Sequence, residues 1–521
     1  MDNTIYSLLP PLLAILMVVF TRRVLLSLAV GIVTSAFLLA NFNIFDTSVI
    51  IANAVKLIFI SDGALHTSNI FIMLFLLLLG MITAFISILG GSHAFGNWAM
   101  KRVKTRAGAQ FVGFILGIII FIDDYFNALA VGQVTRPITD RQNVSRAKLA
   151  YIIDSTSAPV CVISPISSWG AYIITVIGSI LAVHGVSEYT AFSAFIQLIP
   201  MNFYVWASLG IVLVVIFRNF NLGSMNVHEM RAMREGQLYD PAKPIAGELK
   251  NELPTSRSGS VFDLIFPIIA LIVGTVGVMI WTGYHASEGS PTILKIFENT
   301  DVSTSLLAGG LLALIVTTVM FARQAFVTKS VEPRIFYRGV IEGMKSMLPA
   351  IYILLFAWTI VDLIERLGTG KYLASVAEMW NMNSAFLPVI MFVIAGIMAF
   401  STGTSWGSFG ILLPIAGDMA VATDIHMLLP SLAAVLAGAV FGDHCSPISD
   451  TTILSSTGAG ANHIDHVMTQ LPYAFISAFI SLIGFFIVGF TGSIFLALAV
   501  LFGVLFMFFL FVQDRSKTRT D

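Results

Sequence analysis

The chain has 521 residues, of which 57% are hydrophobic and only 11% are charged. A water-soluble protein of this size needs a much more polar surface, so this composition excludes a soluble globular protein and predicts a chain embedded in a lipid bilayer. The formal net charge of -1 provides no overall field that would attract nucleic acid, so no nucleic-acid partner is expected.

Apolar stretches near the roughly 20-residue length of a membrane-spanning helix recur along the whole chain. They lie at residues 5–20, 24–40, 70–90, 261–283, 304–322, 347–364, 468–490 and 492–512. The first is expected to be a span and not a cleaved signal peptide, because Arg22 and Arg23 follow the apolar run and no small-residue cleavage site appears. Cys161 and Cys445 lie inside apolar segments, which favours two small buried side chains over a disulfide or a metal pair.

The positions of the basic residues predict the orientation of the chain. With the N-terminus outside, all but four of the 28 Lys and Arg residues fall in cytoplasmic segments. These segments are 21–23, 101–106, 136–148, 218–260, 323–346 and 513–521, and the four residues left outside are Lys56, Lys295, Arg366 and Lys371. We expect a multi-pass protein of the bacterial inner membrane, and the positive-inside rule predicts that its N-terminus is outside and its C-terminus is in the cytoplasm.

Two apolar segments do not cross the membrane in this scheme. Segment 107–135 leaves the cytoplasm after Arg106 and returns to it before Arg136, so it is predicted to be a re-entrant hairpin. Segment 386–417 starts outside and reaches residues 418–426, which contain acids but no Lys or Arg. We therefore expect a second hairpin of the opposite sense.

Each predicted hairpin is followed by an over-long apolar stretch that proline interrupts, at 149–183 and at 427–457. Both interruptions read Ser-Pro-Ile-Ser, at 164–167 and 446–449, and a Pro-Ile pair precedes each of them at 137–138 and 414–415. Because the two halves have opposite orientations, these matches predict inverted-topology repeats, an architecture of secondary transporters.

The expected fold is thus an all-α polytopic membrane protein with two inverted repeats, re-entrant hairpins and proline-broken helices. The predicted parts are a first repeat at 1–217, a cytoplasmic linker at 218–260, a second repeat at 261–490, and an extra transmembrane helix with a cytoplasmic tail at 491–521. The linker contains three prolines among charged residues, and its composition predicts a flexible tether.

Broken membrane helices survive only where protein or a water-filled cavity satisfies the freed backbone groups, so the breaks mark candidate binding sites. The candidate residues lie near the breaks and hairpins: Asp123, Asp124, Asn127, Asp154, Ser164, Ser167, Thr402, Thr404, Ser405, Asp443, His444, Ser446, Ser449, Asp450 and Thr451. Their carboxylate, hydroxyl and amide oxygens suit a hard alkali cation. We predict sodium at Asp443, Ser446 and Asp450.

The acids in these segments have two interpretations. A carboxylate inside the bilayer costs on the order of 3 kcal/mol, which favours a functional role. Asp123 and Asp124 are adjacent, and their mutual repulsion favours protonation of one of them, as exchange of a proton for a cation requires. The alternative is that an acid such as Asp154 or Asp443 pairs with a cation or caps a half-helix. His444 either relays protons or donates a hydrogen bond.

Residues 403–407, Gly-Thr-Ser-Trp-Gly, match the nucleophile-elbow pattern of serine hydrolases. An elbow needs a strand-turn-helix setting, whereas this motif lies in an apolar hairpin without an evident histidine partner, and its small residues also permit close helix packing. An intramembrane serine hydrolase that uses Ser405 and a passive channel are therefore alternatives. Paired broken helices with buried acids favour an alternating-access transporter, not an enzyme.

Residues 441–452 read Phe-Gly-Asp-His-Cys-Ser-Pro-Ile-Ser-Asp-Thr-Thr. This segment resembles the NhaC family of sodium/proton antiporters, whose members have a similar Gly-Asp-x-x-Ser-Pro-[Ile/Leu]-Ser-Asp-Thr-Thr segment. The stretch 401–407 is also similar to that family, and the resemblance covers nearly all of the chain apart from the linker and the tail. The chain departs from the exchangers at His444 and Cys445 and in the following residues 453–457, which keeps a sodium-coupled carrier of an organic acid or amino acid open as the alternative.

The resemblance implies ion-coupled transport, because relatives exchange sodium and protons or malate and lactate, and others are proposed to carry amino acids. It implies no cofactor, with Na+ and H+ as the transported or coupling ions. It also implies a scaffold domain and a transport domain that bears both hairpins, in a homodimer within the lipid bilayer.

Overall fold

The structure is a computed structural model that describes residues 4–512 except 22, 62, 122–123, 166, 246–253, 257, 288, 290, 370–371 and 373–382. Within these residues, nine helices are long and apolar enough to cross a membrane. The strands β1 (Ile60–Ser61) and β2 (Ala64–Leu65) form one short antiparallel pair. The predicted all-α polytopic membrane protein is therefore confirmed.

The elements of the first half are η1 (Ile5–Leu8), α1 (Leu9–Thr21), α2 (Val24–Leu39), α3 (Ile44–Phe59), α4 (Thr67–Ile88), α5 (Gly91–Met100), α6 (Arg106–Ile119), α7 (Asp124–Arg141), α8 (Arg146–Ile163), α9 (Ser168–Val183), α10 (Ala191–Met201), α11 (Phe203–Arg218) and α12 (Gly223–Glu235). Those of the second half are α13 (Phe262–Ala286), α14 (Ile293–Glu298), α15 (Val302–Ala322), η2 (Arg323–Val327), α16 (Ile335–Arg366), η3 (Ser384–Phe386), α18 (Leu387–Thr402), α19 (Ser405–Thr423), η4 (Ile425–Met427), α20 (Leu428–Cys445), α21 (Asp450–Ala459), α22 (His463–Thr491) and α23 (Ile494–Phe511).

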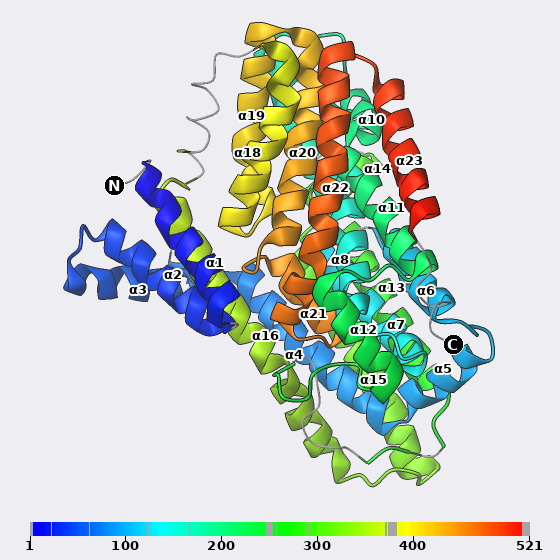
Figure 1. Ribbon diagram of the computed structural model, residues 1–521. Helices are drawn as coiled ribbons and strands as arrows, with labels where there is room; N and C mark the ends of the chain where they lie inside the picture. Colours follow the sequence, from blue (N-terminus) through cyan, green and yellow to red (C-terminus); the bar gives the residue numbers. More distant parts are fainter. Residues whose placement is uncertain are drawn as a thin grey trace.

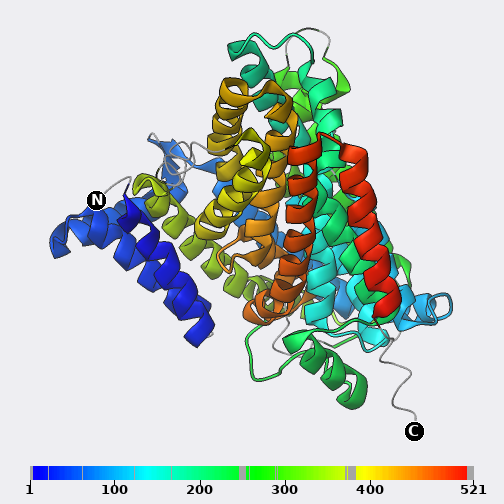
Figure 2. The same cartoon turned by 45° about the horizontal axis from the view of Figure 1, so that its top comes forward.

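The helices form one main bundle with a smaller group on its side. In Figure 1, α18, α19, α20 and α22 lie in the upper part of the bundle, and α7, α8, α12 and α21 lie below them. The helices α1, α2 and α3 project from one side, where they pack against one another and on α16 (Figures 1 and 2). Their outward faces carry many exposed apolar side chains, as expected for surfaces in contact with lipid.

Helix pairs occupy both segments that the sequence predicts to be hairpins. The pairs are α6 with α7 and α18 with α19, and in each pair the two helices pack together. The second pair turns at Gly403, which ends α18 with φ of 72°. A residue with a Cβ atom is strained in this left-handed conformation, so glycine is suited to the turn.

Both Ser-Pro-Ile-Ser segments break a helix in the same way. The first lies between α8 and α9, and the second lies between α20 and α21. Proline cannot donate the backbone hydrogen bond that would continue the helix, and the last serine of each segment starts the next one. Ser167 accepts a hydrogen bond from the backbone N–H of Gly170 (2.9 Å), and Ser449 accepts one from Thr452 (3.3 Å).

The two halves interlock where α7 crosses α21. A Cβ atom built on Gly132 of α7 would lie only 2.7 Å from the Cα atom of Gly458 in α21, so the two backbones are in direct contact. Small residues allow this close approach, which is a common basis of helix association in membranes. The first hairpin is thereby held against the second broken helix.

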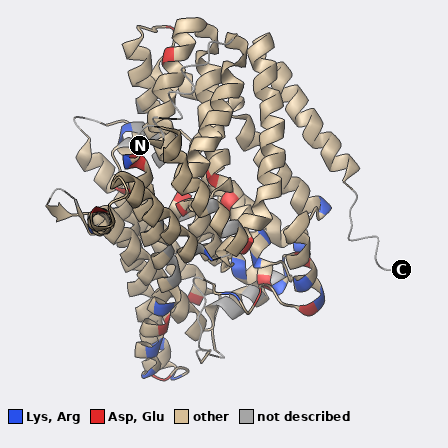
Figure 3. Cartoon of the chain, turned by 60° about the vertical axis from the view of Figure 1, so that its left-hand side comes forward, with Lys and Arg blue, Asp and Glu red and all other residues tan. Residues whose placement is uncertain are grey.

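Hydrogen bonds and ion pairs connect the segments that the sequence places on the same side of the membrane. At one end of the molecule, His184 Nε2 lies 2.8 Å from Asp418 Oδ1, which joins the ends of α9 and α19. At the opposite end, the carboxylate of Glu229 accepts hydrogen bonds from Arg106 (2.8 Å) and Lys148 (3.1 Å). Most of the Lys and Arg residues in Figure 3 lie toward the lower end of the view, and several acids lie in the middle of the bundle.

The prediction that residues 218–260 form a flexible tether is wrong for the first part of this segment. Residues 223–235 form α12, in which Met225, Glu229 and Ala232 are buried at helical spacing. The side chain of Glu229 also accepts the backbone N–H of Ser145 (2.8 Å). A buried carboxylate with several donors stabilises a defined position, which linker composition alone does not indicate.

Candidate ion and solute site

The hairpin turns and the helix breaks meet in the middle of the bundle. The turn of the second hairpin rests on the second break, because a Cβ atom on Gly403 would lie 2.7 Å from Cγ1 of Ile448. The first hairpin reaches the same break, where the hydroxyl of Tyr125 donates to the carboxylate of Asp450. It also reaches the first broken helix, where Nε1 of Trp169 donates to Asp124 (3.0 Å).

Asp443 is a buried acid in the last turn of α20. Its Oδ2 atom accepts hydrogen bonds from the hydroxyls of Ser405 and Thr451, both at 3.1 Å. Its Oδ1 atom is buried and has no hydrogen-bond partner among the described residues. Buried carboxylate oxygens are normally paired, so this oxygen is a candidate position for a bound cation or a proton.

The other predicted sodium ligands lie at the same break. Asp450 is the first residue of α21, and its Oδ1 atom accepts the backbone N–H of Thr451 (2.9 Å). The hydroxyls of Ser449 and Thr451 are 2.8 Å apart. Ser446 donates its proton to the carbonyl of Phe400 in α18 (2.8 Å), and its lone pairs can still coordinate a cation. Residues 443–451 therefore concentrate carboxylate and hydroxyl oxygens within one break.

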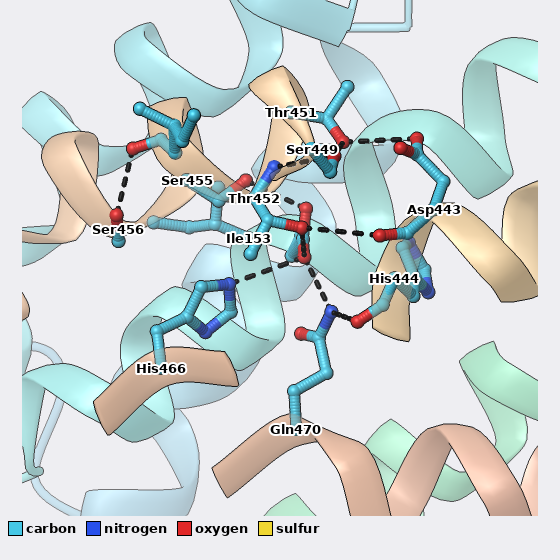
Figure 4. Close-up of polar contacts among 12 residues, drawn as sticks. Ile153, Asp443, His444, Ser449, Thr451, Thr452, Ser455, Ser456, His466 and Gln470 are labelled. Atoms are coloured by element: carbon cyan, nitrogen blue, oxygen red, sulfur yellow. Dashed lines mark hydrogen bonds and ion pairs between the residues drawn. The ribbon is translucent and has the colours of Figure 1, made fainter. Parts of the chain in front are cut away.

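Asp154 has a different environment in the middle of α8. It accepts hydrogen bonds from Ser455 (2.9 Å), Gln470 (2.5 Å) and His466 (3.2 Å), and Thr452 lies at 3.4 Å. In Figure 4, the dashed lines from His466 and Gln470 converge below Thr452, beside the pair formed by Asp443 and Thr451. Protein donors thus surround this carboxylate, which fits the alternative that the acid is held by partners within the fold.

The residues at the first hairpin and the first break mainly hold the backbone. Asn127 donates to the carbonyls of Gly117 and Ile120, both at 2.6 Å, and so ties α7 to the end of α6. Ser164 donates to Val160 of its own helix (2.6 Å). Asp123, the predicted partner of Asp124, lies outside the described residues.

The second hairpin does not have the geometry of a serine nucleophile elbow. Residues 403–407 join two helices, and the only two strands in the described part of the chain are β1 and β2, each two residues long. His444 lies near this hairpin, but its Nδ1 atom pairs with the hydroxyl of Tyr204 (3.1 Å), while Ser405 contacts Asp443. Thr402 donates within α18 (2.9 Å), and Thr404 occupies the N-cap position of α19.

A cavity of about 840 Å³ reaches this region from the end of the molecule that the sequence predicts to be outside. Its wall combines both hairpins, the second break and the residues that precede α15. The lining residues are Ser68, Ile72, Asp124, Tyr125, Tyr172, Phe297, Asn299, Thr300, Asp301, Val302, Ser303, Thr404, Trp406 and Asp450. The cavity therefore places Asp124 and Asp450 next to a space that can hold a solute.

Sequence reasoning missed several residues of this region. Trp169 and Trp406 pack edge to face with ring centroids 5.7 Å apart. Both belong to a Ser-Trp-Gly tripeptide at a helix start, and this repeated tripeptide is the signal that was available in the sequence. His466 and Gln470 are four residues apart near the start of α22, so they share a face. No comparable signal in the sequence points to Asp301.

Comparisons with known proteins agree with this architecture. The model of the Na+/H+ antiporter family matches residues 160–490, which run from just before the first break to the end of α22. An uncharacterized protein of Haemophilus influenzae is 48% identical over 496 residues, which are 94% of this chain and 92% of that protein.

Two relatives with named activities match shorter segments. The malate-2H(+)/Na(+)-lactate antiporter of Bacillus subtilis is 32% identical over 155 residues, 29% of this chain and 32% of that protein. The arginine/ornithine antiporter ArcD of Halobacterium salinarum is 27% identical over 157 residues, 29% of this chain and 31% of that protein. The family match covers more than half of the chain, and the resemblance inferred from residues 441–452 is confirmed. This chain belongs to the Na+/H+ antiporter family and is a multi-pass membrane protein and a secondary transporter.

Proposed function

We propose that this transporter exchanges sodium for protons by alternating access, as a homodimer in the bacterial inner membrane with its N-terminus outside. The observation that carries the proposal is the carboxylate of Asp443, which is buried at a helix break and keeps one oxygen without a partner among the described residues. Asp450 lies at the other side of the same break. Two acids and several hydroxyls at one break suit a cation that leaves most of its water.

The broken helix contributes to the same site. The C-terminal end of α20 carries carbonyl groups that its own helix cannot satisfy, and the end of a half-helix has a partial negative charge. Such ends coordinate cations in other transporters with broken helices. A proton and a sodium ion neutralise Asp443 alternately, so the loaded forms differ in their occupant while the net charge of the site is similar. Exchange of one ion for the other follows from this competition.

The cavity supports an outward-facing arrangement of the site. Phe297 and residues 299–303 line the cavity and belong to the part of the chain that is predicted to be outside, and Asp450 of the second break lines the same cavity. On the opposite side, the hydrogen bonds around Asp154 join α8, α21 and α22. Alternating access then requires the contacts on these two sides to open and close in turn.

The second candidate is sodium-coupled transport of an organic solute. The cavity of about 840 Å³ is much larger than a dehydrated cation needs. It falls within the roughly 300–1,000 Å³ that pockets for small organic ligands occupy. Both candidates use the sodium site at Asp443 and Asp450, and they differ in what moves in exchange.

Ion flux in liposomes tests the sodium site. We expect Asp443→Asn and Asp450→Asn to abolish sodium-driven proton movement, because asparagine keeps the shape and one acceptor oxygen but removes the charge. Asp263→Asn is the control, since Asp263 is also buried but accepts its hydrogen bonds from Ser260 and Gln324 at the start of α13. Near-normal sodium flux in both site variants would reject the assignment.

A further inference from the structure

We propose that the 840 Å³ cavity binds an organic solute through a protonated amine, and that amino acids, not dicarboxylates, are its substrate class. The inference rests on the second candidate function, sodium-coupled transport of an organic solute, and names the class of that solute. The two relatives with named activities act on one solute of each kind, malate and arginine, so the printed names leave the choice open. The residues that line the cavity favour an amino acid over a dicarboxylate.

The charged residues of the cavity are all acidic. Asp124, Asp301 and Asp450 line it, and no Lys, Arg or His is among the described residues that do so. Partial burial acts to raise the pKa of Asp301, but hydrogen bonds from Thr304 and Ser303 outweigh this effect and lower it below its usual value. A dicarboxylate in this space would face like charges without a basic side chain among the described lining residues, whereas an ammonium group would be attracted.

Aromatic rings form a second feature that recognises a cation. Trp406 and Tyr172 both line the cavity, with ring centroids 4.8 Å apart, and 37% of the Trp406 surface is exposed. Trp169 supports the ring of Trp406 from behind and also donates to Asp124. The face of an indole attracts an ammonium group, and more strongly in a partly desolvated site. This aromatic wall is not required to bind a bare sodium ion, and it does not attract the negative charges of a dicarboxylate.

The start of α19 supplies a complementary place for a carboxylate. Thr404 lines the cavity at the N-cap position of this 19-residue helix, and its side chain makes no capping hydrogen bond. The N-terminal end of a helix has a partial positive charge and favours anions. Trp406 follows in the first turn, so the place for the carboxylate and the aromatic wall are adjacent. An amino acid carries both an ammonium group and a carboxylate.

Binding to the purified full-length protein in lipid nanodiscs tests the proposal. Radiolabelled L-arginine is the probe, and agmatine, L-alanine and L-malate are the competitors at a fixed sodium concentration. We expect displacement by alanine, because it keeps both charges, weaker displacement by agmatine, which lacks the carboxylate, and none by malate. Trp406→Leu is expected to weaken arginine binding by about tenfold, as loss of a partly desolvated cation–π contact predicts.

Two further variants keep the test independent of folding. Asp301→Asn changes an exposed acid of the cavity wall and is expected to weaken arginine binding severalfold. Asp418→Asn is the matched control, because Asp418 is an acid of α19 that pairs with His184 away from the cavity. Its binding is expected to equal that of the unchanged protein.

The outcomes separate this inference from the proposed ion exchange. Binding of malate without binding of any amine would overturn the inference. If sodium/proton exchange proceeds in liposomes but no amine binds, the inference is wrong and the proposed exchange remains. If arginine binds with the expected competitor order while sodium/proton exchange is absent, the solute class is supported and the proposed exchange is rejected.

Discussion

Asp154 and Asp443 are two buried acids near the same break, and the structure predicts opposite consequences of removing their charges. Asp154 is surrounded by donors, whereas Asp443 keeps one buried oxygen without a partner in the described part of the chain. We therefore expect Asp154→Asn to reduce stability while folded protein still transports sodium. We expect Asp443→Asn to abolish sodium transport while stability is kept.

The expected changes in the free energy of unfolding follow from the hydrogen bonds to each acid. A hydrogen bond to a charged group contributes about 1.5–3 kcal/mol and a neutral one about 0.5–1.5 kcal/mol. Asp154→Asn converts the bonds from His466 (3.2 Å) and Gln470 (2.5 Å) from the first kind to the second. Weakening two such bonds lowers the free energy of unfolding by about 2–3 kcal/mol. Asp443→Asn weakens the bonds from Ser405 and Thr451 in the same way, but it also removes a buried charge whose Oδ1 atom has no partner among the described residues. The two effects offset each other, so stability changes by less than about 1 kcal/mol.

The assay combines thermal unfolding in nanodiscs with 22Na+ flux in liposomes at matched amounts of folded protein. Asp154→Asn is expected to unfold several degrees below the unchanged protein and to retain most of its flux. Asp443→Asn is expected to unfold near the normal temperature and to show no coupled flux. The reasoning would be refuted by the reverse pattern, in which Asp154→Asn is stable but inactive and Asp443→Asn is active.

Three further predictions follow from the breaks, the buried ion pairs and the topology. Ser446→Ala is expected to slow sodium flux in liposomes more than Ser164→Ala, because only Ser446 joins its break to a hairpin; equal flux in the two variants would contradict this. Glu229→Gln is expected to lower the free energy of unfolding by about 3 kcal/mol, since it leaves the buried Lys148 and the partly buried Arg106 without their counter-charge; an unchanged unfolding temperature would show that the ion pairs contribute little. In intact cells, a membrane-impermeant maleimide is expected to label Ala422→Cys but not Glu235→Cys, and to label Glu235→Cys only after the cells are opened. Labelling of both positions from outside would reject the predicted orientation.

The sequence predicts the breaks of this fold better than its contacts. The Ser-Pro-Ile-Ser segments predict where helices end, because proline and serine act through local backbone chemistry that is independent of the rest of the chain. The partners of Asp154 come from α22, more than 300 residues away, and only tertiary packing brings them together. The same holds for Asp301, which reaches the cavity from the start of α15.

The predicted linker is a second case in which the sequence does not reveal a tertiary contact. Its prolines and charges indicate a tether, yet Glu229 lies fully buried against Lys148. Burial of an acid depends on a cation that is distant in sequence, and composition carries no information about that pairing. Which ion or solute each binding residue holds stays a prediction. The structure shows which atoms lie together, and transport measurements show which residues are needed to move charge.

The side chain of Ile448 connects the second break to helices α1 and α16. Its side chain is buried in a cluster with Ala14 of α1 and with Ile360, Leu363 and Ile364 of α16. Closely packed apolar side chains have discrete arrangements and do not slide freely. The alternating access proposed above, if it moves the broken helix, therefore requires Ile448 to leave its present contacts with α16. The helices α1 and α16 would then contribute to the barrier of the proposed movement through their contacts with this side chain.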